Sequence, residues 1–240
     1  MSMNGIMAIA RREFAAYFGQ PLAYIVLLLF IGTLALPTMV LGDILAETHA
    51  SMRYTFFWIS AALVFFVPAI TMRLVAEEQR TGSIEILCTL PLTAREIIIG
   101  KWCAAVAMVG TGLALTATYP IALSLLGSLD LGPVIGGYFG LLLMGAAFAA
   151  IGLATSALSR FQLVSFLIAT LICGLPWAIG FALSSVSAEW VNTVQYLTFN
   201  YHFNNLAAGT IDTRSVVFFI SICLLAIETA AFAIDRRRLS

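Results

Sequence analysis

The sequence predicts an all-α, polytopic membrane protein with six transmembrane helices, and three observations support this class. Of its 240 residues, 61% are hydrophobic and 10% are charged, whereas a soluble globular domain has roughly 45–50% and 25%. Several stretches without charge reach the roughly 20 residues that a helix needs to cross a bilayer. The basic residues gather in alternate connections between these stretches. This composition excludes an ordinary soluble enzyme.

Residues 1–20 are expected to form an amphipathic helix that lies in the membrane interface. Apolar side chains recur at steps of three and four residues, while Arg11 and Arg12 lie elsewhere on the helical wheel. Such a polar side suits the inner interface, where arginines meet anionic headgroups. Pro21 then turns the chain into the first span. The apolar stripe consists of Met3, Ile6, Met7, Ala10, Phe14, Tyr17 and Phe18.

Six spans follow from the positions of the uncharged stretches. The last of them contains Glu228, the only acid placed inside a span. A carboxylate at membrane depth needs a partner or a proton. We expect Glu228 to pair with an arginine at the cytoplasmic end, such as Arg73 or Arg12, in preference to a role in substrate binding. The spans are placed at residues 21–41, 55–75, 103–126, 133–157, 163–184 and 215–235.

An even number of spans places both termini on the same side of the membrane. That side carries ten of the lysines and arginines, and the other side carries only Arg53 and Arg214. Cytoplasmic connections hold an excess of Lys and Arg in membrane proteins. Both termini and the connection at 76–101 are therefore expected to face the cytoplasm.

The connection at 76–101 is the largest on this side and the richest in charge. Gly82 is expected to end the second helix, and Ser83 to cap a short helix that reaches Leu90 and stops at Pro91. A helix of two turns is not stable alone in water, so it needs a surface to pack against. Two interpretations remain open: a lever that is pushed by a partner, or an interfacial helix that touches only lipid.

A capping box is predicted at the start of the third helix. The Thr93 side chain can accept from the amide of Glu96, whose carboxylate can reach back to the amide of Thr93.

Residues 185–214, between spans five and six, are expected to form an external segment. Their central 22 residues, from Trp190 to Ile211, carry no charge, but they include several side-chain amides, each of which would need a partner inside the membrane. In this segment, Trp190, Val194 and Leu197 are expected to face lipid or protein, and the residues from Asn200 to Asn205 to face water.

The chain offers no recognisable catalytic centre. It has no GxxxxGK[ST] or GxSxG stretch, no HExxH motif and no pair of carboxylates within a span. An ATPase site, a bound cofactor and a metal site are therefore not expected on this chain. A formal charge of zero gives no reason to expect a nucleic-acid partner. An intramembrane protease using Glu77 and Glu78 is a weak alternative, because no histidine lies within a span.

Four segments together resemble permeases of the ABC type-2 transporter family, most closely the gliding-associated branch. They are ARREFAAYFGQPLAYIV, EEQRTGSIEILCTLPLTAREIIIGKW, YLTFNYHFNNLAAGTID and the basic run after the last span. The resemblance covers essentially the whole chain, read as one permease domain over 1–240. It implies location in a bacterial cytoplasmic membrane, with 1–20 as an interfacial elbow, 76–101 as a coupling loop and 185–214 as an external gate.

The resemblance also implies a separate ABC ATPase subunit that binds ATP and Mg²⁺ and receives the coupling helix in a groove. Ile84 and Leu87 would then be buried anchors, and Glu85 a polar rim. The expected partners also include a second permease copy or a related subunit, and membrane lipids. Small residues such as Gly152 and Ser156 suit close helix packing either within one subunit or between two. The residues expected to form or frame the coupling contact are Glu77, Glu78, Gly82, Ser83, Ile84, Glu85, Leu87, Leu90 and Pro91.

The function implied is that of a permease subunit, expected to work as an exporter, that couples ATP hydrolysis by its partner to substrate movement. The alternative is a membrane anchor or mechanical subunit of a gliding-type complex without transport. The side chains do not identify the substrate, nor whether the complex contains one copy of this chain or two.

Overall fold

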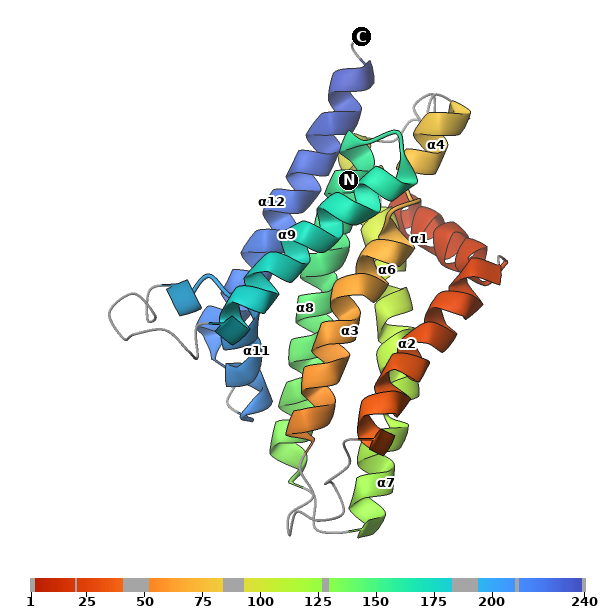
Figure 1. Ribbon diagram of the computed structural model, residues 1–240. Coiled ribbons are helices and arrows are strands. Elements are labelled where there is room, and N and C mark those ends of the chain that lie inside the picture. The colour runs from red at the N-terminus through yellow and green to blue at the C-terminus, as the bar shows by residue number, and fades with distance from the viewer. Residues whose placement is uncertain are drawn as a thin grey trace.

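The computed structural model describes residues 3–19, 21–40, 52–83, 93–126, 130–182, 194–209 and 212–238. All regular structure in these ranges is α-helical, and they contain no strand. The helices form an elongated bundle (Figure 1). They are α1 (Met3–Phe18), α2 (Pro21–Val40), α3 (Arg53–Thr71), α4 (Ala76–Thr81), α6 (Ala94–Thr116), α7 (Thr118–Leu126), α8 (Leu131–Leu158), α9 (Gln162–Ala182), α11 (Phe199–Ala207) and α12 (Thr213–Arg238).

Five helical segments of the described chain are long and apolar enough to cross a membrane. They are formed by α3 with α4, α6 with α7, α8, α9 and α12. A sixth span requires α1 and α2 to be counted together, although the two meet at a bend of 73°. The sequence predicted six spans, so five are found directly and the first depends on this bent pair.

The bundle has two distinct ends in Figure 1. The helix α4 and the C-terminal end of α12 lie at one end, and α7 lies at the other. We call these the α4 end and the α7 end. Because α4 belongs to the predicted connection at 76–101, the α4 end corresponds to the side on which the sequence places both termini.

Helix α8 lies at the centre of the bundle and packs against α3, α6, α9, α11 and α12. Its glycines allow this close packing, because a Cβ at Gly137 would overlap the ring of Phe56 and one at Gly145 would lie 2.6 Å from Val109 Cγ1. The small residues of this span are therefore used for packing inside the subunit. This resolves the choice that the sequence left open for them.

Helix α1 packs across α6, and its contact face differs from the predicted stripe. Ile9, which the stripe omitted, is buried against Gly100, where a Cβ would lie 2.8 Å from the Ile9 Cβ. Tyr17 is buried as well, but Met3 and Met7 are 84% and 68% exposed. The exposed methionines are available to lipid, as an interfacial helix requires, so the predicted interfacial role of this helix stays a prediction.

The second span is interrupted earlier than predicted. The helix was expected to continue to Gly82, but α3 ends at Thr71 and a turn over Met72–Val75 separates it from α4. Gly82 instead ends α4, with a φ of 74° that glycine adopts without strain.

The third span is also interrupted, at Ala117 between α6 and α7. Pro120 has no N–H to donate to the carbonyl of Thr116, four residues earlier. The hydroxyl of Tyr138 on α8 donates to this carbonyl at 2.9 Å instead. A tyrosine from the central helix thus satisfies the backbone group that proline leaves without its usual donor.

The external segment packs inward more than the sequence indicated. In α11, His202 and Phe203 are buried, and Asn200 Nδ2 donates to the carbonyl of Trp177 at 2.9 Å. Asn204 is exposed, as expected. The expectation that the whole run from Asn200 to Asn205 faces water was wrong, because one side of this short helix packs against α8, α9 and α12.

Candidate functional site

The turn between α3 and α4 is held by a serine from another helix. Val75 occupies the N-cap of α4 and makes no side-chain cap of its own. The hydroxyl of Ser156, on α8, accepts from the amides of Val75 and Ala76 at 3.1 and 3.0 Å and donates to the carbonyl of Met72 at 2.9 Å. These amides would otherwise lack partners, as at any helix N-terminus. Ser156 therefore caps the N-terminus of α4, although it lies on a different helix.

Two neighbouring contacts tighten the junction of α4 with α8. One turn before Ser156, Gly152 allows α8 to approach the end of α3, because a Cβ there would overlap the hydroxyl of Thr71. On the other side, Gln79 Nε2 donates to the carbonyl of Ala157 at 2.7 Å. Helix α4 is therefore fixed to α8 through both its first amides and one of its side chains.

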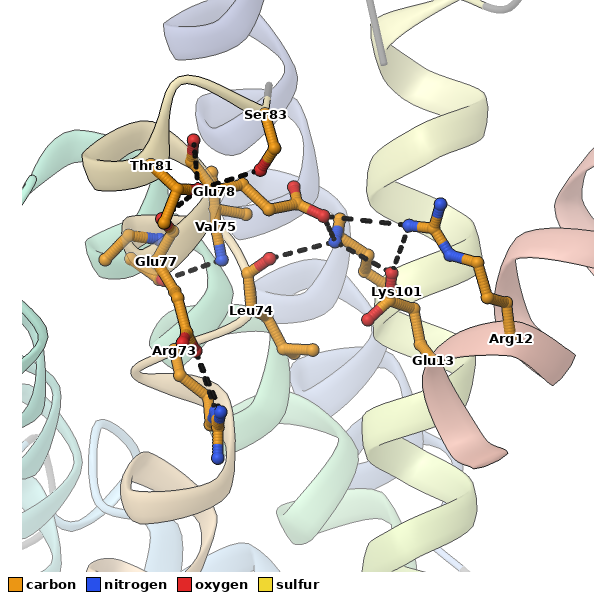
Figure 2. A network of polar contacts seen from close by, with 12 residues as sticks. Arg12, Glu13, Arg73, Leu74, Val75, Glu77, Glu78, Thr81, Ser83 and Lys101 are labelled. Atoms are coloured by element: carbon orange, nitrogen blue, oxygen red, sulfur yellow. Dashed lines mark hydrogen bonds and ion pairs between the residues drawn. The ribbon is translucent and has the colours of Figure 1, made fainter. Parts of the chain in front are cut away.

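Lys101 of α6 also holds the α3–α4 turn and α4 in place (Figure 2). Its side chain is 1% exposed. Its Nζ donates to the carbonyl of Leu74 at 2.9 Å, to Glu78 Oε1 at 2.7 Å and to Glu13 Oε1 at 3.1 Å. An ammonium has three N–H donors, so these contacts use all of them. One buried lysine thus joins α1, the α3–α4 turn, α4 and α6.

Arg12 completes this group of charges. Its Nη2 lies 2.6 Å from Glu13 Oε1 and 3.6 Å from Glu78 Oε1. Burial raises the pKa of Glu13, but the charges of Lys101 and Arg12 and their hydrogen bonds outweigh it and hold the pKa below its usual range. Two cations and two carboxylates are therefore balanced at this position. We call Arg12, Glu13, Glu78 and Lys101 the charge cluster.

The charge cluster fixes geometry more than it adds net stability. A buried ion pair loses much of its attraction to desolvation, but removing one partner leaves a buried charge and is strongly destabilising. The cluster therefore makes it costly for α4 to move away from α1 or α6. The part of the chain that the structure describes holds no group of three or more His, Cys, Asp or Glu side chains suited to a metal ion.

The coupling residues predicted from the sequence fall into three groups. Glu77 pairs with Arg73 at 2.9 Å, and Glu78 points inward to Lys101. The Ser83 hydroxyl shares a hydrogen bond with Thr81 at 2.9 Å, beside Gly82 at the exposed end of α4. The remaining predicted residues, Ile84, Glu85, Leu87, Leu90 and Pro91, lie outside the described residues.

The predicted capping box is present at the start of α6. The amide of Glu96 donates to Thr93 Oγ1 at 3.3 Å, and the amide of Thr93 donates to Glu96 Oε2 at 3.0 Å. Between these two residues, Arg95 pairs with Glu228 of α12 at 2.8 Å. The sequence predicted that Glu228 pairs with an arginine of the predicted cytoplasmic side, and Arg95 is such a residue, although it is neither of the two examples, Arg73 and Arg12. The capping box sets the direction in which α6 begins, and this directs Arg95 toward α12.

Of the residues predicted for the external gate, the structure describes Val194 and Leu197. Val194 is half-buried and Leu197 is 69% exposed in the segment before α11. Trp190 lies outside the described residues. These three assignments therefore stay predictions.

Sequence reasoning missed Lys101 and Ser156 as site residues. For Lys101 there was a usable signal: it lies two turns after the capping box and directly before an uncharged stretch, so a buried partner was required. Ser156 gave no comparable signal, because a serine among alanines and glycines is typical of any packed membrane helix.

Residues 23–230 match the family model described as "ABC-2 family transporter protein". This range includes all the long helices from α3 to α9, most of α2 and most of α12. No curated protein matches the chain.

Proposed function

We propose, from the premise that this chain belongs to the ABC-2 family of transporter proteins, that α4 and its supports transmit force from a partner ATPase to the transmembrane helices. The family identifies the chain as a multi-pass membrane permease subunit of an ABC transporter. Such a subunit carries no ATPase domain and normally works with an ABC ATPase subunit. The proposal adds where the two subunits meet and how the movement spreads.

The single observation that carries this proposal is the buried Lys101. Its three hydrogen bonds make α1, the α3–α4 turn, α4 and α6 respond together to displacement of any one of them. Ser156 extends this connection to α8, and the pair of Arg95 with Glu228 extends it to α12. A push on α4 would therefore reach α1, α6, α8 and α12 through polar contacts, and the energy of such contacts depends steeply on distance.

The ATPase contact itself is proposed to be the exposed end of α4 with the segment that follows it. Glu78 supports this surface from beneath, since its carboxylate is directed toward Lys101. The residues exposed on α4 are Arg80 and Thr81. Beyond them, the sequence supplies Ile84 and Leu87 as anchors and Glu85 as a polar rim. ATP and Mg²⁺ would be held by the partner.

We further propose that the α4 end faces the cytoplasm of a bacterial cell, which agrees with the ten-to-two distribution of Lys and Arg. Helix α1 would then be the interfacial elbow. The assignment to export, and to the gliding-associated branch, rests on the resemblance of the 76–101 loop and of the three other segments. Two permease subunits would form the membrane part of the complex.

The experiment that tests this proposal is co-purification with the ATPase in mild detergent. The variant Glu85→Arg with Leu87→Asp changes the proposed contact without touching Lys101 or Ser156. We expect normal membrane insertion and an unchanged thermal unfolding temperature, with loss of the bound ATPase. The control Arg214→Glu reverses an exposed charge in the first turn of α12, the end of that helix away from α4, and should retain the ATPase. Full retention of the ATPase by the double variant would contradict the proposal.

A second measurement separates transport from a purely mechanical role. The permease and its ATPase are reconstituted in vesicles, and ATP hydrolysis is compared with movement of candidate substrates. Hydrolysis accompanied by movement supports the exporter. Hydrolysis without movement of any candidate substrate would favour the anchoring or mechanical alternative.

A further inference from the structure

Two hollows between α1, α2 and α3 meet and form one elongated site. The first, the charged pocket, has a volume of about 180 Å³ and is lined by Glu13, Tyr17, Arg73, Glu77 and Glu78 among others. The second, the apolar groove, has a volume of about 550 Å³ and is lined largely by α2 and α3 side chains, including Phe30, Trp58, Phe65 and Phe66. Val26 and Ala69 line both hollows. A single ligand with a polar head and an apolar tail fits this arrangement.

The charged pocket contains groups of both signs. Arg73 donates to Glu77 Oε2 through Nε and Nη2, at 3.1 and 2.9 Å. A guanidinium has five N–H donors, so these two bonds leave others to reach an anion. Glu13 and Glu78 are matched by Lys101 and Arg12. The local charges therefore balance, which favours a head that is neutral as a whole but carries both signs.

One of the residues that line this pocket carries a buried atom without a hydrogen-bond partner among the described residues. Glu78 Oε1 accepts from Lys101, but Glu78 Oε2 is buried without a donor in the described part of the chain. A buried carboxylate oxygen without a donor is costly, so this position favours a ligand that supplies an N–H. A primary ammonium can supply one, whereas a quaternary ammonium cannot.

We propose that the two hollows bind a phospholipid of the surrounding membrane whose zwitterionic head carries a primary amine. The phosphate would lie against Arg73, the ammonium would donate to the Glu78 carboxylate once rotation of that side chain turns Oε2 toward the pocket, and an acyl chain would occupy the apolar groove. The occupant is drawn from the inner leaflet, which rests on the orientation given under the proposed function. Through Glu78 and Glu13, the lipid adjoins the charge cluster that holds α4 in place.

The test measures lipid binding by the purified full-length chain with native mass spectrometry. Phosphatidylethanolamine, phosphatidylcholine and phosphatidylglycerol of equal chain length are offered at equal concentrations. We expect phosphatidylethanolamine to bind most tightly, because it alone has both the phosphate and the N–H donors. Equal binding of the three lipids, or a preference for phosphatidylglycerol, would overturn the proposal.

Two variants probe the two halves of the site. Arg73→Gln removes the phosphate partner and should weaken phosphatidylethanolamine binding about tenfold or more, as expected for a charge-assisted hydrogen bond. Ala69→Leu narrows the junction of pocket and groove without changing charge, and should also weaken binding. The control Arg160→Gln removes an exposed arginine that lines neither hollow.

Thermal unfolding distinguishes lost binding from lost folding in these variants. If Arg73→Gln unfolds early, Ala69→Leu still decides the outcome, because it leaves every charge in place. Binding by both folded variants equal to that of Arg160→Gln would refute the lipid site. This result would leave the ATPase proposal standing, because recruitment of the ATPase is measured separately with the Glu85 and Leu87 substitutions.

Discussion

The short helices α4 and α11 are both anchored to longer helices, but by different chemistry. Helix α4 is held by buried charges and by a hydroxyl from α8. Helix α11 is held by aromatic side chains: Phe199 meets Phe148 with ring centroids 5.0 Å apart, and His202 stacks on Phe218 at 4.0 Å. The only hydrogen bonds described for the His202 ring join it to Ser215 and to the carbonyl of Tyr196.

This difference determines how each helix can move. Separating a buried charge from its partner is costly over a short distance, so α4 should move as one body with the groups that hold it. An aromatic pair contributes only about 0.5–1.5 kcal/mol beyond the area it buries, so a small shift of such a pair costs less than separating buried charges. We infer that the α4 attachment is built to transmit displacement, whereas the α11 attachment tolerates it.

The largest effect is expected from Lys101→Met, which removes the cation that both Glu13 and Glu78 contact. Breaking a buried charge network by removing one partner costs about 3–5 kcal/mol of stability. Thermal unfolding of the purified protein in detergent would measure this loss. A loss no greater than that of an exposed ion pair would show that α4 is not held by charge.

The pair of Arg95 and Glu228 provides the matched control for this measurement. Both side chains are more than half exposed, at 62% and 54%. Exposed ion pairs typically contribute between about 0 and 1 kcal/mol. Arg95→Met removes a cation that also joins two helices, and it should therefore change stability far less than Lys101→Met.

A smaller effect is expected from Ser156→Ala. The substitution leaves the amides of Val75 and Ala76 without their acceptor, and an unsatisfied buried group costs about 1–3 kcal/mol. Hydrogen exchange at these two amides should rise before the rest of α3 is affected. Ser221→Ala removes an exposed hydroxyl that bonds only within its own helix, to Val217, and should change neither measurement. Unaltered exchange at both amides in Ser156→Ala would show that the cap is not needed.

The smallest effect is expected at α11, where acid should weaken the attachment. The Tyr196 carbonyl can only accept, so His202 Nε2 carries the proton and Nδ1 accepts from Ser215. Burial lowers the pKa of His202, despite the opposing influence of the Tyr196 carbonyl and of Asp212. Stability should therefore be full above the ordinary histidine pKa of about 6.5 and fall as the pH decreases through that value toward the lowered one.

The measurement for His202 is unfolding temperature against pH, compared between the parent chain and His202→Gln. Glutamine retains a donor and an acceptor but does not titrate, so the variant should lose the change that histidine causes below its ordinary pKa of about 6.5. A pH dependence that is identical in the two proteins would assign the effect to other groups.

Local features of this chain were predictable from the sequence, and distant ones were not. The box of Thr93 and Glu96 needs only two residues three positions apart, so its pattern is visible in the sequence. The contact of Ser156 with Val75 joins residues 81 positions apart, and that of Lys101 with Glu13 spans 88. Their pairing depends on the order in which the helices pack, which charge counts and periodicity do not specify.

The details that the sequence left open have the same origin. The sequence predicted an arginine of the cytoplasmic side for Glu228, but only the position of α6 beside α12 makes that partner Arg95. The periodicity of residues 1–20 did not include Ile9, which the crossing with α6 buries because Gly100 leaves room for it. In both cases a specific helix–helix contact decides a detail that a pattern within one helix does not contain.

The break at Ala117 also bears on how the protein fits its bilayer. The continuous stretch Ala94–Leu125 has 32 residues, and a straight helix of that length would measure about 48 Å at 1.5 Å per residue. The hydrocarbon layer is only about 30 Å thick. Such hydrophobic mismatch is relieved by tilting, kinking or local thickening of the bilayer. The bond from Tyr138 to Thr116 satisfies the backbone at the break between α6 and α7, so the surplus length can extend past the lipid tails without exposing a bare carbonyl to them.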